Sequence, residues 1–126
     1  MTHEKSTRPS LGKLGEDMAT QHLKSKGWSI LERNWRYSRL GEIDLIAYDS
    51  ETQCLHIVEV KARHKSATGS AIEAITPSKQ AKLNQLAEIY LSNPPEIPIN
   101  SISMDIIAIN VSSKGELILD FVENAF

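Results

Sequence analysis

The chain has few of the side chains that form covalent or metal cross-links. It contains one cysteine, Cys54, and four histidines in 126 residues. A single cysteine cannot form an internal disulfide, and scattered histidines without further cysteines do not supply the four nitrogen and sulfur ligands of a structural zinc site. Proteins without disulfides are typical of reducing compartments, so we expect a cytoplasmic protein.

Long apolar runs are also missing. No run approaches the roughly 20 residues that a membrane-spanning helix requires. Residues 1–10, MTHEKSTRPS, are polar and lack the apolar core of a signal peptide or anchor. We expect them to form a flexible tail. Residues 11–126 then form a single domain, long enough to bury roughly two thirds of the surface of its unfolded chain.

The charge is nearly balanced but unevenly distributed. The chain has 14 Lys and Arg against 16 Asp and Glu, a formal net charge of −2. Residues 1–82 hold 13 of the basic and 10 of the acidic residues, whereas residues 83–126 hold one and six. This asymmetry is either a chance feature or a mildly basic surface near a phosphate-binding site.

Hydrophobic periodicity and turn signals predict two helices and five strands. Ser10 and Gly27 bracket the first helix as N-cap and C-terminal stop, and Thr76 is the N-cap of the second. The apolar stripe of the first helix includes Leu14. This order of elements predicts an α/β or α+β fold, in which a mixed sheet carries helices. The predicted elements are helix 11–26, strands 28–35, 42–49 and 54–62, helix 77–92, and strands 101–110 and 116–122.

The strands at 42–49 and 54–62 carry charged residues within apolar sequence. A hairpin that turns about residues 51 and 52 would place Asp44 opposite Glu59. The same register would place Glu42 opposite Lys61 on the same face, because side chains alternate along a strand. The other face could then be wholly buried, with the apolar side chains of Ile43, Leu45, Ala47, Val58 and Val60.

In this register the Cβ atoms of Asp44 and Glu59 lie about 5 Å apart, where like charges destabilise a sheet. A proton on one carboxyl group, a nearby cation such as Lys61, or a divalent metal ion would offset the repulsion. A solvated sheet face with Glu–Lys pairs is the alternative that spacing alone leaves open. His56 faces away from Glu59, so we expect it to be packed rather than catalytic.

Four segments resemble the YraN-type family of small bacterial proteins: GKLGEDMATQHLKSKGWSILERNWR, GEIDLIAYD, HIVEVKAR and SKQAKLNQLAEIYL. That family is placed in the PD-(D/E)XK, or restriction-endonuclease-like, superfamily and is distantly similar to archaeal Holliday-junction resolvases. The resemblance runs over residues 11–105 and implies a mixed β-sheet flanked by helices. The chain departs from the family at Ser103-Met104-Asp105, where relatives tend to show arginine, phenylalanine and aspartate. In those relatives the arginine is expected to contact a phosphate group.

The resemblance implies roles for individual residues. Asp44 matches the first metal-binding acid of the superfamily, and Glu59 and Lys61 match its acid-x-lysine pair. Glu16 matches an additional acid of resolvase-like members, and its alternative role is a charge favoured near a helix N-terminus. Four basic residues are expected to hold a nucleic-acid backbone: Arg36, Arg63, Lys65 and Lys79.

The function that this resemblance implies is a Mg²⁺- or Mn²⁺-dependent endonuclease acting on DNA, including branched or junction DNA. Asp44 and Glu59 would hold the metal ion, and Lys61 and Glu16 would complete the catalytic set. A junction presents two symmetric cuts, so by analogy we expect a homodimer. The superfamily also contains members that bind nucleic acid without cutting it, so a non-catalytic binding module is the first alternative. A protein-interaction domain whose carboxylates only pair with lysines is the second.

Overall fold

The computed structural model describes residues 10–64, 73 and 75–126, so most of the expected tail lies outside the described residues. Within them, neither helix is long and apolar enough to span a membrane. The α+β order of the elements is as predicted, and each predicted boundary is confirmed to within two residues. The elements are α1 Leu11–Ser25, β1 Ser29–Tyr37, β2 Gly41–Asp49, β3 Cys54–His64, α2 Pro77–Leu91, β4 Ser101–Val111 and β5 Leu117–Val122.

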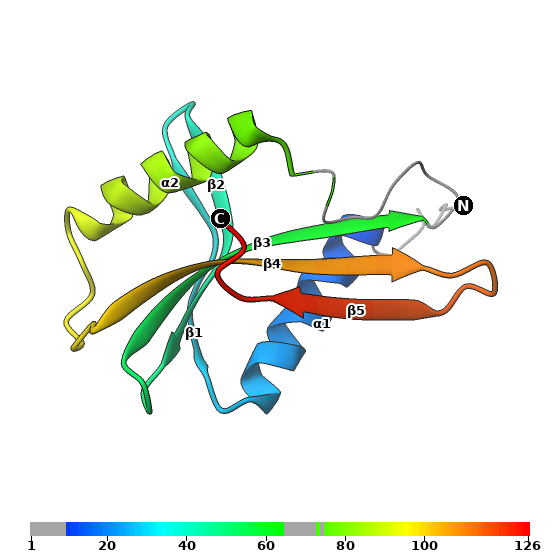
Figure 1. Ribbon diagram of the computed structural model, residues 1–126, viewed down its shortest axis with the longest axis horizontal. Helices are drawn as coiled ribbons and strands as arrows, with labels where there is room; N and C mark the ends of the chain where they lie inside the picture. The colour runs from blue at the N-terminus through cyan, green and yellow to red at the C-terminus, as the bar shows by residue number, and fades with distance from the viewer. Residues whose placement is uncertain (1–9, 65–72, 74) are drawn as a thin grey trace, which may run out of the picture.

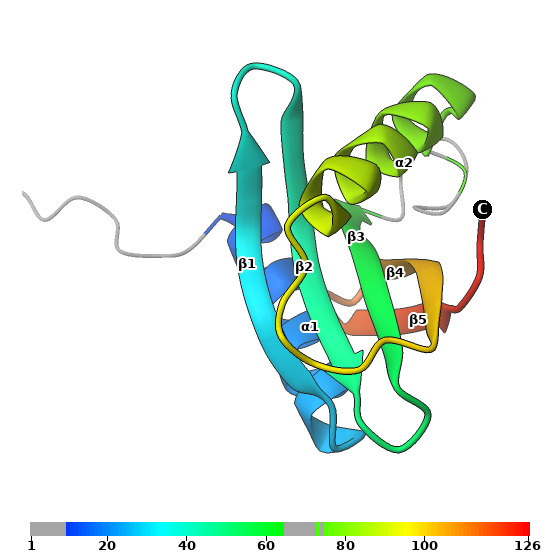
Figure 2. The ribbon, with the colours of Figure 1, turned by 90° about the vertical axis from the view of Figure 1, so that its left-hand side faces the viewer.

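The strands form one five-stranded mixed sheet in the order β1-β2-β3-β4-β5. Neighbouring strands are antiparallel except β3 and β4, which are parallel because α2 carries the chain back between them. Figure 1 shows the two helices on opposite sides of the sheet. In Figure 2, α2 lies in front of the sheet and α1 behind it. We call the two sides the α1 face and the α2 face.

Capping residues set the ends of both helices. The Ser10 Oγ accepts a hydrogen bond from the Lys13 N–H at 3.1 Å, and the Thr76 Oγ1 accepts one from the Lys79 N–H at 3.1 Å. Gly27 follows the C-cap of α1 with a φ of 85°, a left-handed conformation that glycine adopts without steric cost. The predicted caps and stop are therefore confirmed.

Small residues let α1 approach the sheet closely. Gly15 and Ala19 are buried, whereas Leu14 is 40% exposed. The prediction that Leu14 belongs to the buried stripe is therefore wrong. The helix packs on the sheet through Gly15, Ala19, Thr20 and Leu23. A Cβ atom added to Gly15 would lie 3.1 Å from the Cβ of Ala62 on β3. The next residue of α1, Glu16, accepts a hydrogen bond from Asn34 of β1.

A buried polar network joins β3, β4 and the segment after β5. Asp105 is fully buried, and its Oδ2 lies 2.6 Å from the Nδ1 of His56. Its Oδ1 accepts hydrogen bonds from the Ser103 hydroxyl and, at 3.1 Å, from the Asn124 N–H. His56 also stacks on Trp28, with 3.9 Å between ring centroids. The prediction that His56 is packed is confirmed.

We expect an Asp105→Ala substitution to destabilise the fold strongly. It leaves the buried His56 without the acceptor of its Nδ1 and removes an acceptor from the buried Ser103 hydroxyl and the Asn124 N–H. The loss of an acceptor by a buried donor costs roughly 1–3 kcal/mol. Urea denaturation should show a fall of about 3 kcal/mol in the free energy of unfolding. The control substitution Asp120→Ala removes an exposed carboxylate of β5. It should change the free energy of unfolding by less than about 0.5 kcal/mol. A fall below about 1 kcal/mol for Asp105→Ala would contradict a stabilising role for the network.

We also expect a Gly15→Val substitution to disturb the docking of α1. The added methyl groups would press on Ala62, and overpacking of this kind costs typically 1–3 kcal/mol. Gly12→Val is the matched control, because the nearest atom to its added Cβ is 3.9 Å away. Thermal unfolding should show a clear loss of stability for the first variant and little change for the second. Equal effects would show that α1 does not depend on this contact.

Candidate metal and nucleic-acid site

The strands β2 and β3 pair near their turn and then diverge. Their antiparallel pairs follow the register predicted for a turn about residues 51 and 52 as far as the last pair, Leu45 with Val58. The predicted pairing of Asp44 with Glu59 and of Glu42 with Lys61 is wrong, because the strands separate before reaching these residues. Beyond it, β2 stays paired with β1 while β3 stays paired with β4 as far as His64. Figure 1 shows the two strands separating. We call the point of separation, immediately beyond Leu45 and Val58, the fork.

Asp44 provides a hydrogen-bond acceptor at the fork. Its Oδ2 accepts a hydrogen bond from the Val60 N–H at 2.8 Å. Continued pairing of the strands would have offered backbone carbonyl groups to β3 here, so the carboxylate takes the place of a ladder partner. The position of the Asp44 side chain is therefore set by the separation of the strands.

The alternation of faces along β2 is interrupted at the same residue. Leu45 packs on the α1 face and Ile43 on the α2 face, although residues two apart share a face in a regular strand. Across from Asp44 on β1, Asn34 has a φ of 54°, and the β1–β2 pairs skip these two residues. The prediction that Ile43 and Leu45 share a face is therefore wrong. Asp44 lies where the strand turns from one face to the other.

Glu59 is the buried acid of the fork. It is only 6% exposed, and its Oε2 lies 3.3 Å from the Nζ of Lys79 in the first turn of α2. Its Oε1 is buried and has no hydrogen-bond partner in the described part of the chain. The cation beside the two acids is thus Lys79, whereas the sequence suggested that Lys61 would be this cation. Lys61 is exposed and lies further along β3.

The two acids interact directly. Burial and the charge of Glu59 raise the pKa of Asp44 to about 8, although the Val60 N–H acts in the opposite direction. A carboxyl group with this pKa is mostly protonated at neutral pH. The structure therefore brings Asp44 and Glu59 together, and a proton and an ammonium group offset their repulsion.

Glu16 approaches Asp44 from the α1 side. Its Oε1 accepts a hydrogen bond from the Asn34 Nδ2 at 3.1 Å and lies 3.8 Å from the Arg33 guanidinium. Its charge also contributes to the raised pKa of Asp44. Glu16 is in the second turn of α1, beyond the first turn in which the helix dipole acts. The geometry therefore relates Glu16 to the fork more than to the helix N-terminus.

The four basic residues expected to contact nucleic acid have different surroundings. Arg36 pairs with Glu42 across β1 and β2 at 2.9 Å, with its side chain 64% exposed. Arg63 is partly buried near the end of β3. Lys79 is paired with the buried acid of the fork, and Lys65 lies outside the described residues. Arg36 and Lys79 are thus engaged with carboxylates.

The donor set at the fork consists of two carboxyl groups. In the described ranges 10–64, 73 and 75–126, no three His, Cys, Asp or Glu side chains gather closely enough to bind one ion by themselves. Mg²⁺ commonly takes one or two protein carboxylates and completes its shell with water and phosphate oxygens, and Mn²⁺ prefers the same oxygen ligands. The unpartnered Oε1 of Glu59 and the adjacent Asp44 therefore fit a hard divalent cation.

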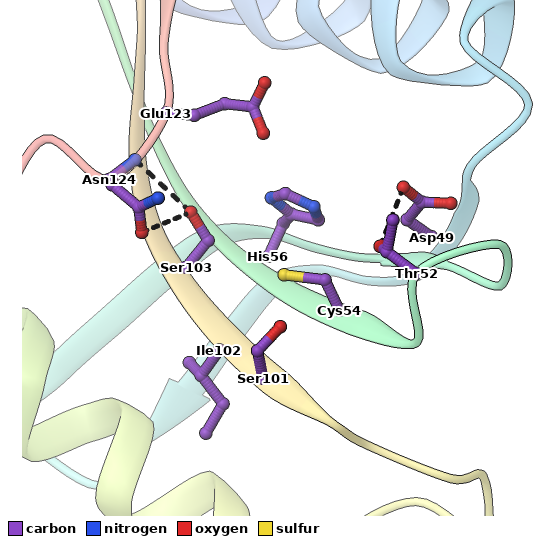
Figure 3. Close-up of a pocket in the computed structure, with 9 residues that line it drawn as sticks. All are labelled: Asp49, Thr52, Cys54, His56, Ser101, Ile102, Ser103, Glu123 and Asn124. Atoms are coloured by element: carbon purple, nitrogen blue, oxygen red, sulfur yellow. Dashed lines mark hydrogen bonds between the residues drawn. The ribbon is translucent and has the colours of Figure 1, made fainter.

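A separate cavity of about 250 Å³ lies at the turn end of β3 (Figure 3). Burial raises the pKa of the Cys54 thiol there, which disfavours the reactive thiolate. The neighbouring His56 is held by Asp105 in the buried network. The Cys54 thiol is therefore not an activated nucleophile. It is lined by Asp49, Thr52, Cys54, His56, Ser101, Ile102, Ser103, Glu123 and Asn124.

We expect Asp44 to make the metal-free protein less stable as pH rises. Its pKa is about 8 in the folded state, whereas an unperturbed aspartate has a pKa of 3.8. Between these values the native state holds a proton that the unfolded state has lost. The stabilisation is complete below about pH 4 and is lost as pH approaches 8. Urea denaturation with a chelator present should show the stability of wild type falling relative to Asp44→Asn, by at most about 1.4 kcal/mol per pH unit. A pH-independent difference would contradict this.

Comparison with known proteins identifies relatives of the whole site region. The model of the family described as "Uncharacterised protein family UPF0102" matches residues 15–109. The chain is 36% identical over 115 residues to a UPF0102 protein of Kineococcus radiotolerans, covering 91% of each chain. It is 39% identical over 117 residues to one of Dictyoglomus turgidum, covering 92% of this chain and 96% of that one. For one of Mycobacterium sp. strain KMS the identity is 41% over 109 residues, covering 86% and 79%. The chain therefore belongs to the UPF0102 family, the YraN-type family that its motifs resemble.

Proposed function

We propose that this protein is a Mg²⁺- or Mn²⁺-dependent nuclease that hydrolyses phosphodiester bonds in DNA at the fork. The observation that carries the proposal is the meeting of Asp44 with the buried Glu59, whose Oε1 lacks a partner in the described part of the chain. A buried carboxylate oxygen without a partner is costly. A divalent cation would satisfy it and would also remove the repulsion between the two acids.

Asp44 and Glu59 would hold the metal ion. A bound divalent cation supplies an activated water at neutral pH and stabilises the negative charge that develops on the phosphate. Because the pKa of Asp44 is about 8, this carboxyl group has to release its proton when it becomes a ligand. The Val60 N–H would keep the carboxylate in place through that change, since it already donates to Oδ2.

The residues around the fork have complementary roles in the proposal. Lys61 is exposed and follows Glu59 by two residues, so its ammonium group would orient the attacking water or stabilise the phosphate oxygens. Glu16 would bind a ligand water from the α1 side. Arg36 and Arg63, on the strands next to the fork, would contact the DNA backbone.

The resemblance to Holliday-junction resolvases supports two further parts of the proposal. The substrate would be branched or junction DNA, and a homodimer would supply the two symmetric cuts. The protein would act in the cytoplasm, where bacterial DNA is found.

Cleavage assays test the proposal. Purified protein is incubated with duplex, flap and four-way-junction DNA in the presence of Mg²⁺, Mn²⁺ or a chelator. We expect metal-dependent cleavage that falls at least about a hundredfold in Asp44→Ala and Glu59→Ala, because each removes a metal ligand. Asp120→Ala, which removes an exposed acid of β5, should retain activity. Cleavage that survives Asp44→Ala would identify a contaminating nuclease and contradict the assignment.

Binding measurements separate the alternatives. Calorimetric titration of Mn²⁺ into wild type should show binding that Glu59→Ala abolishes. Salt-dependent DNA binding without turnover, and without an effect of metal, would favour a non-catalytic nucleic-acid-binding module. The absence of DNA binding at low salt, where phosphate contacts are strongest, would favour a protein-interaction domain.

A further inference from the structure

Lys79 occupies a position that local helix physics does not favour. It is the third residue of α2, after the Thr76 N-cap and Pro77. The positive end of the helix dipole favours acids in this turn, and after a threonine cap the third residue is the glutamate position of a capping box. The first turn of α2 has no acidic residue. The ion pair with Glu59 accounts for a lysine at this position.

The two partners of this ion pair differ in burial. The Glu59 side chain is 7% exposed, whereas the Lys79 side chain is 45% exposed. The ammonium group thus reaches the acid from the surface on a flexible four-carbon stem. It can return to water at little cost, since ion pairs of exposed lysines contribute little. The carboxylate, in contrast, cannot remain buried without a counter-charge. Glu59 therefore requires a cation, and Lys79 is a replaceable one.

We propose that Lys79 is a positioning residue that occupies the cation's place at Glu59 in the metal-free protein and is displaced when a divalent cation binds. The inference rests on the proposed function. The Lys79 Nζ is 3.3 Å from Oε2, so a cation bound to the same carboxylate would repel it at close range. The displaced ammonium group would face solvent on the α2 side and become available to a DNA phosphate. Metal binding would thus convert an internal ion pair into a nucleic-acid contact.

Amine labelling of the full chain tests this inference. The protein is treated with a limiting amount of an acylating reagent with and without Mn²⁺, and modification of each lysine is quantified by mass spectrometry. We expect Mn²⁺ to increase labelling of Lys79 severalfold, because the ion pair no longer shields its nitrogen. Lys82 is exposed one turn further along α2, and Lys13 is 57% exposed on α1. Labelling of these two controls should not change.

A Glu59→Gln variant provides a test that does not depend on metal. Without its carboxylate partner, Lys79 should be labelled at the higher rate whether or not Mn²⁺ is present. Equal labelling of Lys79 in metal-free wild type and in this variant would overturn the inference. Mn²⁺ binding to wild type, seen by calorimetry, without a change at Lys79 would overturn the inference and leave the proposed nuclease intact. Failure of wild type to bind Mn²⁺ would overturn both.

Discussion

The hydrogen bond from the Val60 N–H to the Asp44 carboxylate is the interaction on which the centre of this protein depends. Two strands that separate leave backbone groups without ladder partners, and buried groups of this kind are almost always satisfied in native proteins. The carboxylate satisfies the donor at the point of separation. The fork can therefore open without an orphaned N–H, and the same bond holds the Asp44 carboxyl group next to Glu59.

The fork brings like charges together, and the charges that compensate them are removable. A proton resides on Asp44 at neutral pH because its pKa is about 8, and the Lys79 ammonium group neutralises Glu59 from a half-exposed side chain. In the proposed function, either would leave when a divalent cation binds. We therefore propose that this site binds such an ion reversibly.

The network around Asp105 is such a structural arrangement. Its carboxylate has buried donors from His56 and Ser103 and a backbone donor from Asn124. The Asp105 network and the acids of the fork both include a residue of β3. Side-chain alternation separates them, because His56 lies on the α1 face and Glu59 on the α2 face. On one face, β3 thus contributes to a network whose polar groups have hydrogen-bond partners. On the other face it carries Glu59, whose Oε1 has no hydrogen-bond partner in the described part of the chain.

Sequence alone determined the elements of the fold and the pairing of its central hairpin. Caps such as Thr76, the stop at Gly27 and the alternation of apolar residues act over a few residues, so they are readable without coordinates. The same alternation predicted that Asp44 and Glu59 lie close together, although the pairs of β2 and β3 end one residue earlier, at Leu45 and Val58. The family resemblance then attached a metal ion and a nucleic acid to these acids.

Tertiary structure alone decided which groups surround the acids. The change of face at Ile43 accompanies the left-handed conformation of Asn34 and the separation of β2 from β3. The partnership of Lys79 with Glu59 depends on where α2 crosses the sheet. Patterns of spacing report neighbours within one element, whereas the partner of a buried charge is selected by the packing of elements that are distant in sequence. For that reason the acids were predictable and their counter-ion was not.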